Sequence, residues 1–220
     1  MTFLKRGAEA VVGTVSFEGR KTVLKERVRK NYRIEELDKR LRSQRTRSES
    51  RITGEAKRAG VNAPAVYFTD EKNFKIYFEL IEGVTLKDAF AESKEKRIYE
   101  LAENWGRETA KLRTAGIIHG DLTTSNLIVK DDDLYVLDFG LAFFSKRDED
   151  MAEDVNLLRQ SLEATHSEFS DLIWQGFIKG YANYSKSVEV IRRASVIASR
   201  GRYSKRVKIT FIMLKSFTIN

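Results

Sequence analysis

Three oxygen-bearing side chains stand at fixed intervals in one short stretch of this 220-residue chain. Asp121 and Asn126 lie at opposite ends of a short loop, and Asp138 ends a predicted strand–turn–strand unit formed by residues 127–130 and 134–138. Because the second strand pairs with the first, it returns Asp138 to the side of Asn126. Carboxylate and amide oxygens gathered in this way suit the hard cation Mg²⁺. The stretch therefore requires a fold in which a hairpin ends at a metal site.

The residues around these three side chains form a recognisable order. HGDLTTSN at 119–126 precedes DFG at 138–140, with the strand–turn–strand unit between them. A lone Asp, Asn or DFG is common by chance, but this order in this context is the protein-kinase signature of a catalytic loop and a metal-binding Asp. Phosphoryl transfer needs positioning and charge neutralisation, which such residues supply. We therefore expect a phosphoryl-transfer centre that uses ATP and Mg²⁺.

A kinase-like centre also needs a strand lysine and a helix glutamate in the N-terminal half. Residues 10–28 alternate apolar and polar side chains around a turn, which predicts a hairpin with Lys25 on its second strand, where it would bind nucleotide phosphates. Residues 34–59 carry apolar side chains at three- and four-residue steps and predict a helix. Glu49 on that helix is the candidate partner of Lys25, and Glu55 is the alternative.

A second strand–turn–strand unit is predicted over residues 65–83. Its last strand would join the two halves of the chain above the nucleotide base. From this topology, backbone groups from Glu79 to Ile81 are expected to bind adenine, and Val12 and Phe78 are expected to provide apolar walls.

The pattern of the chain changes near Glu82, from a β-rich half with one helix to a mostly helical half. It predicts an α+β fold, a minimal bilobal protein-kinase-like fold. Residues 1–82 would form the N-terminal lobe, residues 83–206 a reduced C-terminal lobe with a basic tail, and residues 207–220 an apolar extension.

The amino-acid composition excludes several kinds of catalytic and metal site. The chain has no cysteine and only two histidines, which excludes disulfides and thiolate catalysis and argues against zinc or histidine-held metals. No apolar run is long enough to span a membrane, and the N-terminus lacks the apolar centre of a signal peptide. The sequence therefore predicts a cytoplasmic protein without membrane contact.

Basic residues are concentrated in two segments. The segment from Arg20 to Arg58 contains fifteen Lys and Arg but only six Asp and Glu. After Glu189 there are eight basic residues and no acidic one. Such segments either form solvated helix faces or bind a polyanion such as RNA or nucleotide phosphates.

Five segments together resemble the PRPK family, the small atypical kinases of the KEOPS complex in archaea and eukaryotes. The similarity covers about residues 3 to 206. It rests on GAEA at 7–10, KERVRKNYRIEELD at 25–38, RTRSES at 45–50, HGDLTTSN at 119–126 and DFGLAFF at 138–144.

The resemblance implies a role for each motif residue. Asp121 would be the catalytic base, and Lys25 would pair with Glu49. Asn126 and Asp138 would be the Mg²⁺ ligands.

The same resemblance implies that Asp154 braces the catalytic loop. The alternative for Asp154 is an acidic residue in the first turn of a helix, where it complements the helix dipole.

The resemblance also implies a function within an assembly. The family supports threonylcarbamoyl adenosine modification of tRNA as a serine/threonine kinase or ATPase. Its partners are the catalytic tRNA-modifying subunit and the other KEOPS subunits. The basic tail at 199–206 would extend toward that subunit and its tRNA.

The chain departs from ordinary protein kinases in three places. Residues 7–13 replace a GxGxxG loop and suggest a stiffer turn with Glu9 inside it, over the phosphates. Gly120 replaces the arginine that a phosphorylated activation loop would bind. No APE motif follows, and 13 residues separate Gly140 from Asp154, so the activation segment and peptide-docking helices are missing.

Two other functions remain open from the sequence. A small-molecule phosphotransferase of the antibiotic-kinase type also uses HGDxxxxN, although such enzymes have a longer helical region after DFG. A non-catalytic tRNA-binding scaffold would account for the basic segments.

Overall fold

The computed structural model describes residues 2–7 and 9–200. The predictions for the apolar extension at 207–220, and for the basic tail beyond residue 200, lie outside this part of the chain. Within it, no helix combines the length and the apolar character needed to cross a membrane.

The N-terminal half contains an antiparallel sheet with the strand order β1-β2-β3-β5-β4. The predicted hairpin pairs in full, and the register sets Lys25 of β3 between Val12 of β2 and Ile76 of β5. These three side chains share one face of the sheet. The strands are β1 (Thr2–Arg6), β2 (Ala10–Phe17), β3 (Arg20–Arg27), β4 (Val66–Asp70) and β5 (Lys75–Glu79).

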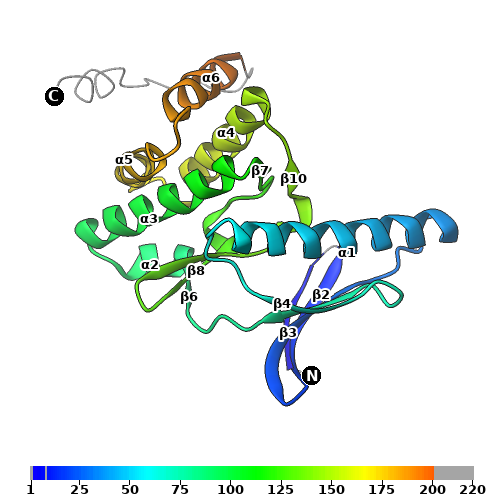
Figure 1. The fold of residues 1–220 in the computed structure, drawn as a ribbon. Helices are drawn as coiled ribbons and strands as arrows, with labels where there is room; N and C mark the ends of the chain where they lie inside the picture. Colours follow the sequence, from blue (N-terminus) through cyan, green and yellow to red (C-terminus); the bar gives the residue numbers. More distant parts are fainter. Residues whose placement is uncertain (1, 8, 201–220) are drawn as a thin grey trace.

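A long helix, α1 (Glu35–Arg58), lies across this sheet (Figure 1). The predicted apolar stripe is wrong for the start of the helix, since Ile34 is the N-cap residue and is 72% exposed. Up to Glu49 the buried residues of α1 are polar, namely Asp38, Thr46 and Glu49, and Asp38 and Glu49 pair with charged side chains. The predicted apolar positions Ile52 and Ala56 are buried.

The C-terminal half is mostly helical, with short strands between its first and second groups of helices (Figure 1). The predicted boundary near Glu82 falls in the segment between β5 and β6, and the division into two lobes stays a prediction. The elements are β6 (Val84–Thr85), α2 (Leu86–Glu92), α3 (Glu95–Thr114), β7 (Ile117–Ile118), η1 (Thr124–Asn126), β8 (Leu127–Lys130), β9 (Asp133–Val136), η2 (Phe139–Leu141), β10 (Phe143–Phe144), α4 (Asp148–Thr165), α5 (Ser170–Tyr181) and α6 (Ser187–Arg200).

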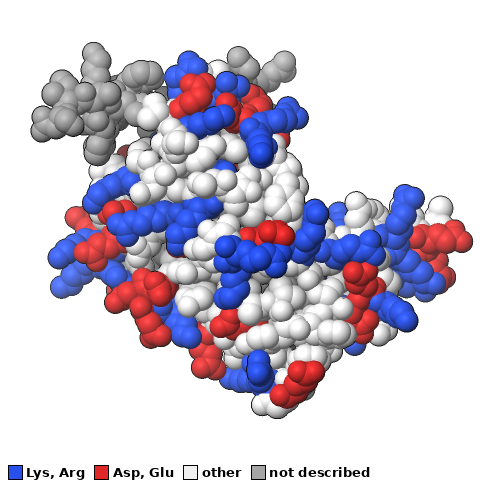
Figure 2. Space-filling view, viewed as in Figure 1, with Lys and Arg blue, Asp and Glu red and all other residues white. Residues whose placement is uncertain are grey.

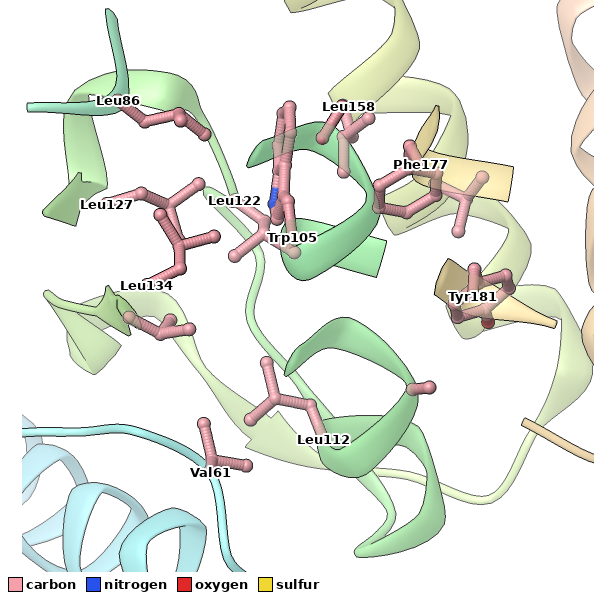
Figure 3. Packing of buried hydrophobic residues seen from close by; sticks show 14 of the residues in the cluster. Val61, Leu86, Trp105, Leu112, Leu122, Leu127, Leu134, Leu158, Phe177 and Tyr181 are labelled. Atoms are coloured by element: carbon pink, nitrogen blue, oxygen red, sulfur yellow. The ribbon is translucent and has the colours of Figure 1, made fainter. Parts of the chain in front are cut away.

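One hydrophobic core joins the helical half to the end of α1. Figure 3 shows Trp105 of α3 close to Phe177 of α5, with Leu122 of the catalytic loop beside the same helix. The rings of Trp105 and Phe177 meet edge to face at 5.5 Å between centroids, an arrangement that aromatic pairs favour. The core therefore supports the loop that carries Asp121.

Helices α3 and α5 pack with their backbones in close approach at glycines. A Cβ atom on Gly180 would collide with the carbonyl oxygen of Glu103 and lie 2.8 Å from the amide nitrogen of Arg107. A Cβ on Gly106 would lie 2.6 Å from the amide nitrogen of Tyr181. The side chain of any other residue would push the two helices apart.

We predict that Gly180→Ala destabilises the protein by about 3 kcal/mol, because the added methyl group overpacks the α3–α5 contact. Urea unfolding followed by circular dichroism measures the change. Gly54→Ala in α1 is the matched control, since its nearest neighbours would be the Arg58 side chain at 3.8 Å. The control is expected to be neutral or to stabilise by up to about 1 kcal/mol; equal stability of both variants contradicts the close-packing argument.

Candidate active site

The predicted hairpin brings the three oxygen-bearing side chains together. Strand β8 pairs with β9, and the Leu137 N–H donates to the Asn126 carbonyl at 2.8 Å, which sets Asp138 beside Asn126. The Asn126 amide nitrogen donates to the Asp121 carboxylate and to its backbone carbonyl, each at 2.9 Å. The Asn126 side chain therefore fixes the position of Asp121, and the carboxyl group of Asp121 remains exposed to solvent.

His119 lies beneath this loop and is completely buried. Its Nε2 lies 3.0 Å from the Leu137 carbonyl, so Nε2 carries the proton and Nδ1 accepts from the Asp121 N–H at 3.3 Å. Its ring packs against Phe139 at 5.0 Å between centroids. Burial lowers the pKa of His119 below its ordinary value, which keeps the ring neutral.

Asp154 holds the same loop from the other side. Its buried carboxylate accepts hydrogen bonds from the N–H groups of Gly120 at 2.9 Å and His119 at 3.3 Å. This geometry fits the bracing role that the family resemblance implied. The alternative, an acidic residue in a first helical turn, is wrong, because α4 begins at Asp148.

Arg113 of α3 completes this brace and was not identified from the sequence. Its fully buried guanidinium pairs with Asp154 and donates to the Ile117 carbonyl at 2.7 Å. The only sequence signal is its position four residues after Thr109, on the buried face of the predicted helix.

Gly120 occupies the position where ordinary kinases carry arginine. Its φ of +78° lies in the left-handed region that favours glycine, and a Cβ atom there would lie 2.8 Å from the carbonyl oxygen of Leu141. The chain after the DFG motif therefore lies too close for a side chain at this position.

Lys25 pairs with the predicted glutamate. Its Nζ donates to Glu49 at 2.6 Å and to Asp138 at 2.7 Å. The alternative, Glu55, lies on the outer face of α1 and pairs with Arg58 at 2.6 Å. Of the two candidates, the structure therefore places Glu49 at the site.

The two carboxylates determine the charge of the lysine. Burial alone would lower the pKa of Lys25, but Glu49 and Asp138 outweigh burial and raise that pKa above its ordinary value. Burial likewise acts to raise the pKa of Asp138, but Lys25 and the Gly140 N–H outweigh it and lower that pKa. Both groups are therefore charged at neutral pH.

Arg27, two residues after Lys25, is a second buried cation that the sequence analysis missed. It pairs with the other carboxylate oxygen of Glu49. The signal was present, since residues two apart on a strand share a face and Lys25 was already assigned to that face.

Glu9, which the sequence suggested lies inside a turn over the phosphates, is paired with arginines in the structure. Its carboxylate pairs with the Arg33 guanidinium at 3.3 Å and with that of Arg45, and it lies 4.0 Å from Arg27. The Glu9 side chain is thus fixed to arginines from β3, the following loop and α1.

The predicted nucleotide-base residues divide into two groups. Val12 and Phe78 share the sheet face of Lys25, as expected of apolar walls, and Val23, which pairs with Phe78, joins them. The Glu79 N–H donates to the Ala65 carbonyl at 2.8 Å, so this backbone donor is already used.

The residues present fit Mg²⁺ held together with phosphate. The described residues contain no group of three His, Cys, Asp or Glu side chains able to hold a metal alone. Mg²⁺ is commonly held by one or two carboxylates together with substrate phosphates, so Asp138 and the Asn126 amide oxygen suffice as protein ligands. The fold and the site define a kinase-like phosphotransferase.

Comparisons with known proteins support this class. The family model described as "RIO domain" matches residues 10–171. The chain is 38% identical over 219 residues to the KEOPS complex subunit Bud32 of Pyrococcus abyssi, with 96% of this chain and 100% of that protein covered. The chain belongs to the RIO domain family, in the Bud32 branch that the sequence analysis named PRPK, so that prediction is confirmed.

Two further similarities concern a longer protein and a solved structure. The chain is 43% identical over 203 residues to a probable bifunctional tRNA threonylcarbamoyladenosine biosynthesis protein of Methanosarcina mazei, with 91% of this chain and 35% of that protein covered. It therefore spans about a third of that relative. The Rio2 kinase-ADP/Mg2+-phosphoaspartate complex of Chaetomium thermophilum matches with a TM-score of 0.60 at 14% identity, over 90% of this chain and 71% of that one. The predicted α+β, protein-kinase-like fold is confirmed.

We predict that Glu49→Gln lowers the free energy of unfolding by about 3 kcal/mol or more, because it removes the charge shared by two buried cations. Urea unfolding at neutral pH measures the effect. Glu55→Gln is the matched control on the same helix and is expected to change stability by less than about 0.5 kcal/mol. Similar losses in both variants are inconsistent with the assignment of Glu49.

We also predict that the melting temperature falls as the pH is lowered from about 7 to 5. Burial lowers the pKa of both His119 and His166 in the folded chain, while unfolded histidines take up protons near pH 6.5. The unfolded state then binds more protons, so stability falls with falling pH. His119→Asn should flatten this dependence more than His166→Asn, since His166 is only half-buried; an unchanged slope in His119→Asn rules out the assigned cause.

Proposed function

We propose that this chain is an Mg-ATP-dependent phosphotransferase, an atypical serine/threonine kinase or ATPase, which acts as a subunit of a KEOPS-type complex. One observation carries the proposal: Lys25 is bonded to Glu49 and Asp138, and Asp138 ends the hairpin that begins directly after Asn126, whose side chain holds Asp121. One hairpin thus connects a cation, two metal-ligand candidates and an exposed carboxylate.

The residues have complementary tasks. Lys25 binds the nucleotide phosphates, and its position is kept by Glu49. Asp138 and Asn126 hold Mg²⁺, which neutralises phosphate charge when bound. Asp121 accepts the proton of the attacking hydroxyl group or water, and Asn126 keeps its carboxylate oriented for that transfer.

The nucleotide base fits between the two predicted lobes. Val12 and Phe78 provide apolar contact from the sheet, and the backbone around Ile81 supplies hydrogen-bonding groups for adenine. In this arrangement the triphosphate would extend toward Lys25 and Asp138.

A place in a complex is supported by the names of relatives. The Pyrococcus abyssi protein is a KEOPS complex subunit, and the Methanosarcina mazei protein is named for tRNA threonylcarbamoyladenosine biosynthesis. We infer that this chain assembles in the cytoplasm with a catalytic tRNA-modifying subunit and other KEOPS subunits. Its phosphoryl transfer or ATP hydrolysis supports the modification of tRNA.

The short chain after the DFG motif favours such a partner over a wide range of peptide substrates. Strand β10 pairs with β7 directly after η2, and α4 begins at Asp148. The described chain at this place forms two strand residues and a short connection, without the docking helices of a protein-substrate kinase.

Basic side chains favour tRNA as a second ligand. Figure 2 shows Lys and Arg gathered over the helix α1. Arg40, Arg47 and Arg51 are spaced along this helix at its surface, where they suit the phosphates of a nucleic acid. Among the described residues, this basic surface is the feature that supports the alternative function, a non-catalytic tRNA-binding scaffold.

We predict that Asp121→Asn lowers ATP turnover by about 10²-fold or more, the usual loss when a general base is removed, while leaving Mg-ATP binding intact. Asp138→Asn should weaken the dependence of nucleotide binding on Mg²⁺ as well as turnover. Turnover is measured with and without the reconstituted complex and tRNA. Asp132→Asn, in the exposed hairpin turn, is the matched control.

Wild-type turnover in both variants contradicts the proposal. Salt-dependent tRNA binding that persists in Asp138→Asn, together with no nucleotide binding by the wild type, supports the scaffold function instead.

A further inference from the structure

Arg27 is buried at the centre of the site without a role in the proposed mechanism. Its side chain is 6% exposed, and it shares the Glu49 carboxylate with Lys25. Its Nε is buried and has no hydrogen-bond partner within the part of the chain that the structure describes. A buried guanidinium with an unused donor is costly, which is why such groups generally serve a ligand or a network.

The two buried cations outnumber the one carboxylate between them. Glu49, itself 1% exposed, offers one negative charge to Lys25 and Arg27. The remaining positive charge is compensated by two carboxylates that are partly open to solvent. Asp138 lies 2.7 Å from Lys25, and Glu9 lies 4.0 Å from Arg27. Part of the compensation of each buried cation therefore comes from a carboxylate on the solvent side, where a ligand anion can reach the same cation.

Arg27 faces the same space as the other phosphate-site groups. A Cβ atom built on Gly140 would lie 3.4 Å from Nζ of Lys25 and 3.5 Å from Nη2 of Arg27. The same Cβ position lies 2.9 Å from Oδ1 of Asp138, so these three side chains approach one another beside Gly140. Arg27 thus reaches the region where Mg²⁺ and the terminal phosphates are expected.

The Glu9 carboxylate is an anion of the chain itself that lies beside Arg27 and two other arginines. Its carboxylate lies 3.3 Å from Arg33, pairs with Arg45 and lies 4.0 Å from Arg27, and its side chain is 39% exposed. Three arginines from separate segments converge on one carboxylate at the turn predicted to cover the phosphates. A carboxylate and a phosphate oxygen make the same charge-assisted hydrogen bonds to guanidinium groups, so one can replace the other.

We propose that Arg27 is a second phosphate-binding cation of this site, and that the Glu9 carboxylate competes with the terminal phosphate of ATP for it. The inference rests on the proposed function, since it needs ATP to bind beside Lys25. When the triphosphate binds, Arg27 donates to a phosphate oxygen, and Glu9 remains paired with Arg33 and Arg45. The Glu9 turn then limits ATP affinity by its charge.

A purely structural role for Arg27 is the competing explanation. In that case Arg27 only neutralises Glu49, and the charge of Glu9 is irrelevant to nucleotide binding. The two explanations differ in how variants of Glu9 and Arg27 affect ligands with and without phosphates.

The test compares dissociation constants of Mg-ATP and adenosine, measured by calorimetry on the wild type, Glu9→Gln, Arg27→Lys and the double variant. Arg27→Lys keeps a positive charge beside Glu49 and so protects folding. We expect Glu9→Gln to tighten Mg-ATP binding, and Arg27→Lys to weaken it, each on the order of tenfold. Adenosine binding should not change, and the gain from Glu9→Gln should disappear in the double variant.

Two charge-matched controls lie on the outside of the same region. Glu26→Gln removes a carboxylate 3.7 Å from Lys75, and Arg29→Gln removes a guanidinium 3.7 Å from Glu35. Both should leave the Mg-ATP constant within about twofold of the wild type.

The outcomes separate this inference from the function on which it rests. Unchanged or weaker Mg-ATP binding in Glu9→Gln, or an equal change for adenosine, overturns the inference while wild-type ATP binding upholds the function. A wild type that binds no ATP overturns the proposed function, and this inference with it.

Discussion

The site depends on a single buried carboxylate. Glu49 extends from α1 to the sheet and accepts from Lys25 with one oxygen and from Arg27 with the other. Without it, two cations would stand close together in a region of low dielectric. The pairing also explains why α1 buries a carboxylate at Glu49, since the helix meets charged groups of β3 there. Charge pairing at Glu49 and apolar packing at Ile52 and Ala56 thus both hold α1 in place.

A second charged pair, Arg113 with Asp154, organises the catalytic loop from below. Asp154 holds the N–H groups of His119 and Gly120, and neutral His119 in turn holds Asp121 by its backbone. The exposed carboxylate of Asp121 is therefore the end of a chain of buried contacts. The two charged pairs act on opposite sides of the centre, one through the sheet and one through the helices.

The sequence predicted those parts of the site that depend on the order and periodicity of strands and helices along the chain. A hairpin sets Asp138 beside the catalytic loop, and strand and helix periodicity brought Glu49 to the correct face. It did not reveal Arg113, whose partner Asp154 is distant in sequence. Arg27 was overlooked although strand alternation puts it on the face of Lys25, because arginine is abundant throughout this chain. The start of α1 was mispredicted because Ile34 satisfies the helical spacing yet lies in solvent. Pattern alone does not distinguish a face that meets charges from one that meets apolar residues.

The brace at Asp154 has a consequence for control. In this loop, glycine stands where a phosphate-responsive arginine would be, and the arginine that orders the loop is sealed inside the helical half. The contacts that order the loop are thus supplied by the folded chain itself, without a covalent modification. For a loop held in this way, the arrival of ligands at the site is the step that is left open to control.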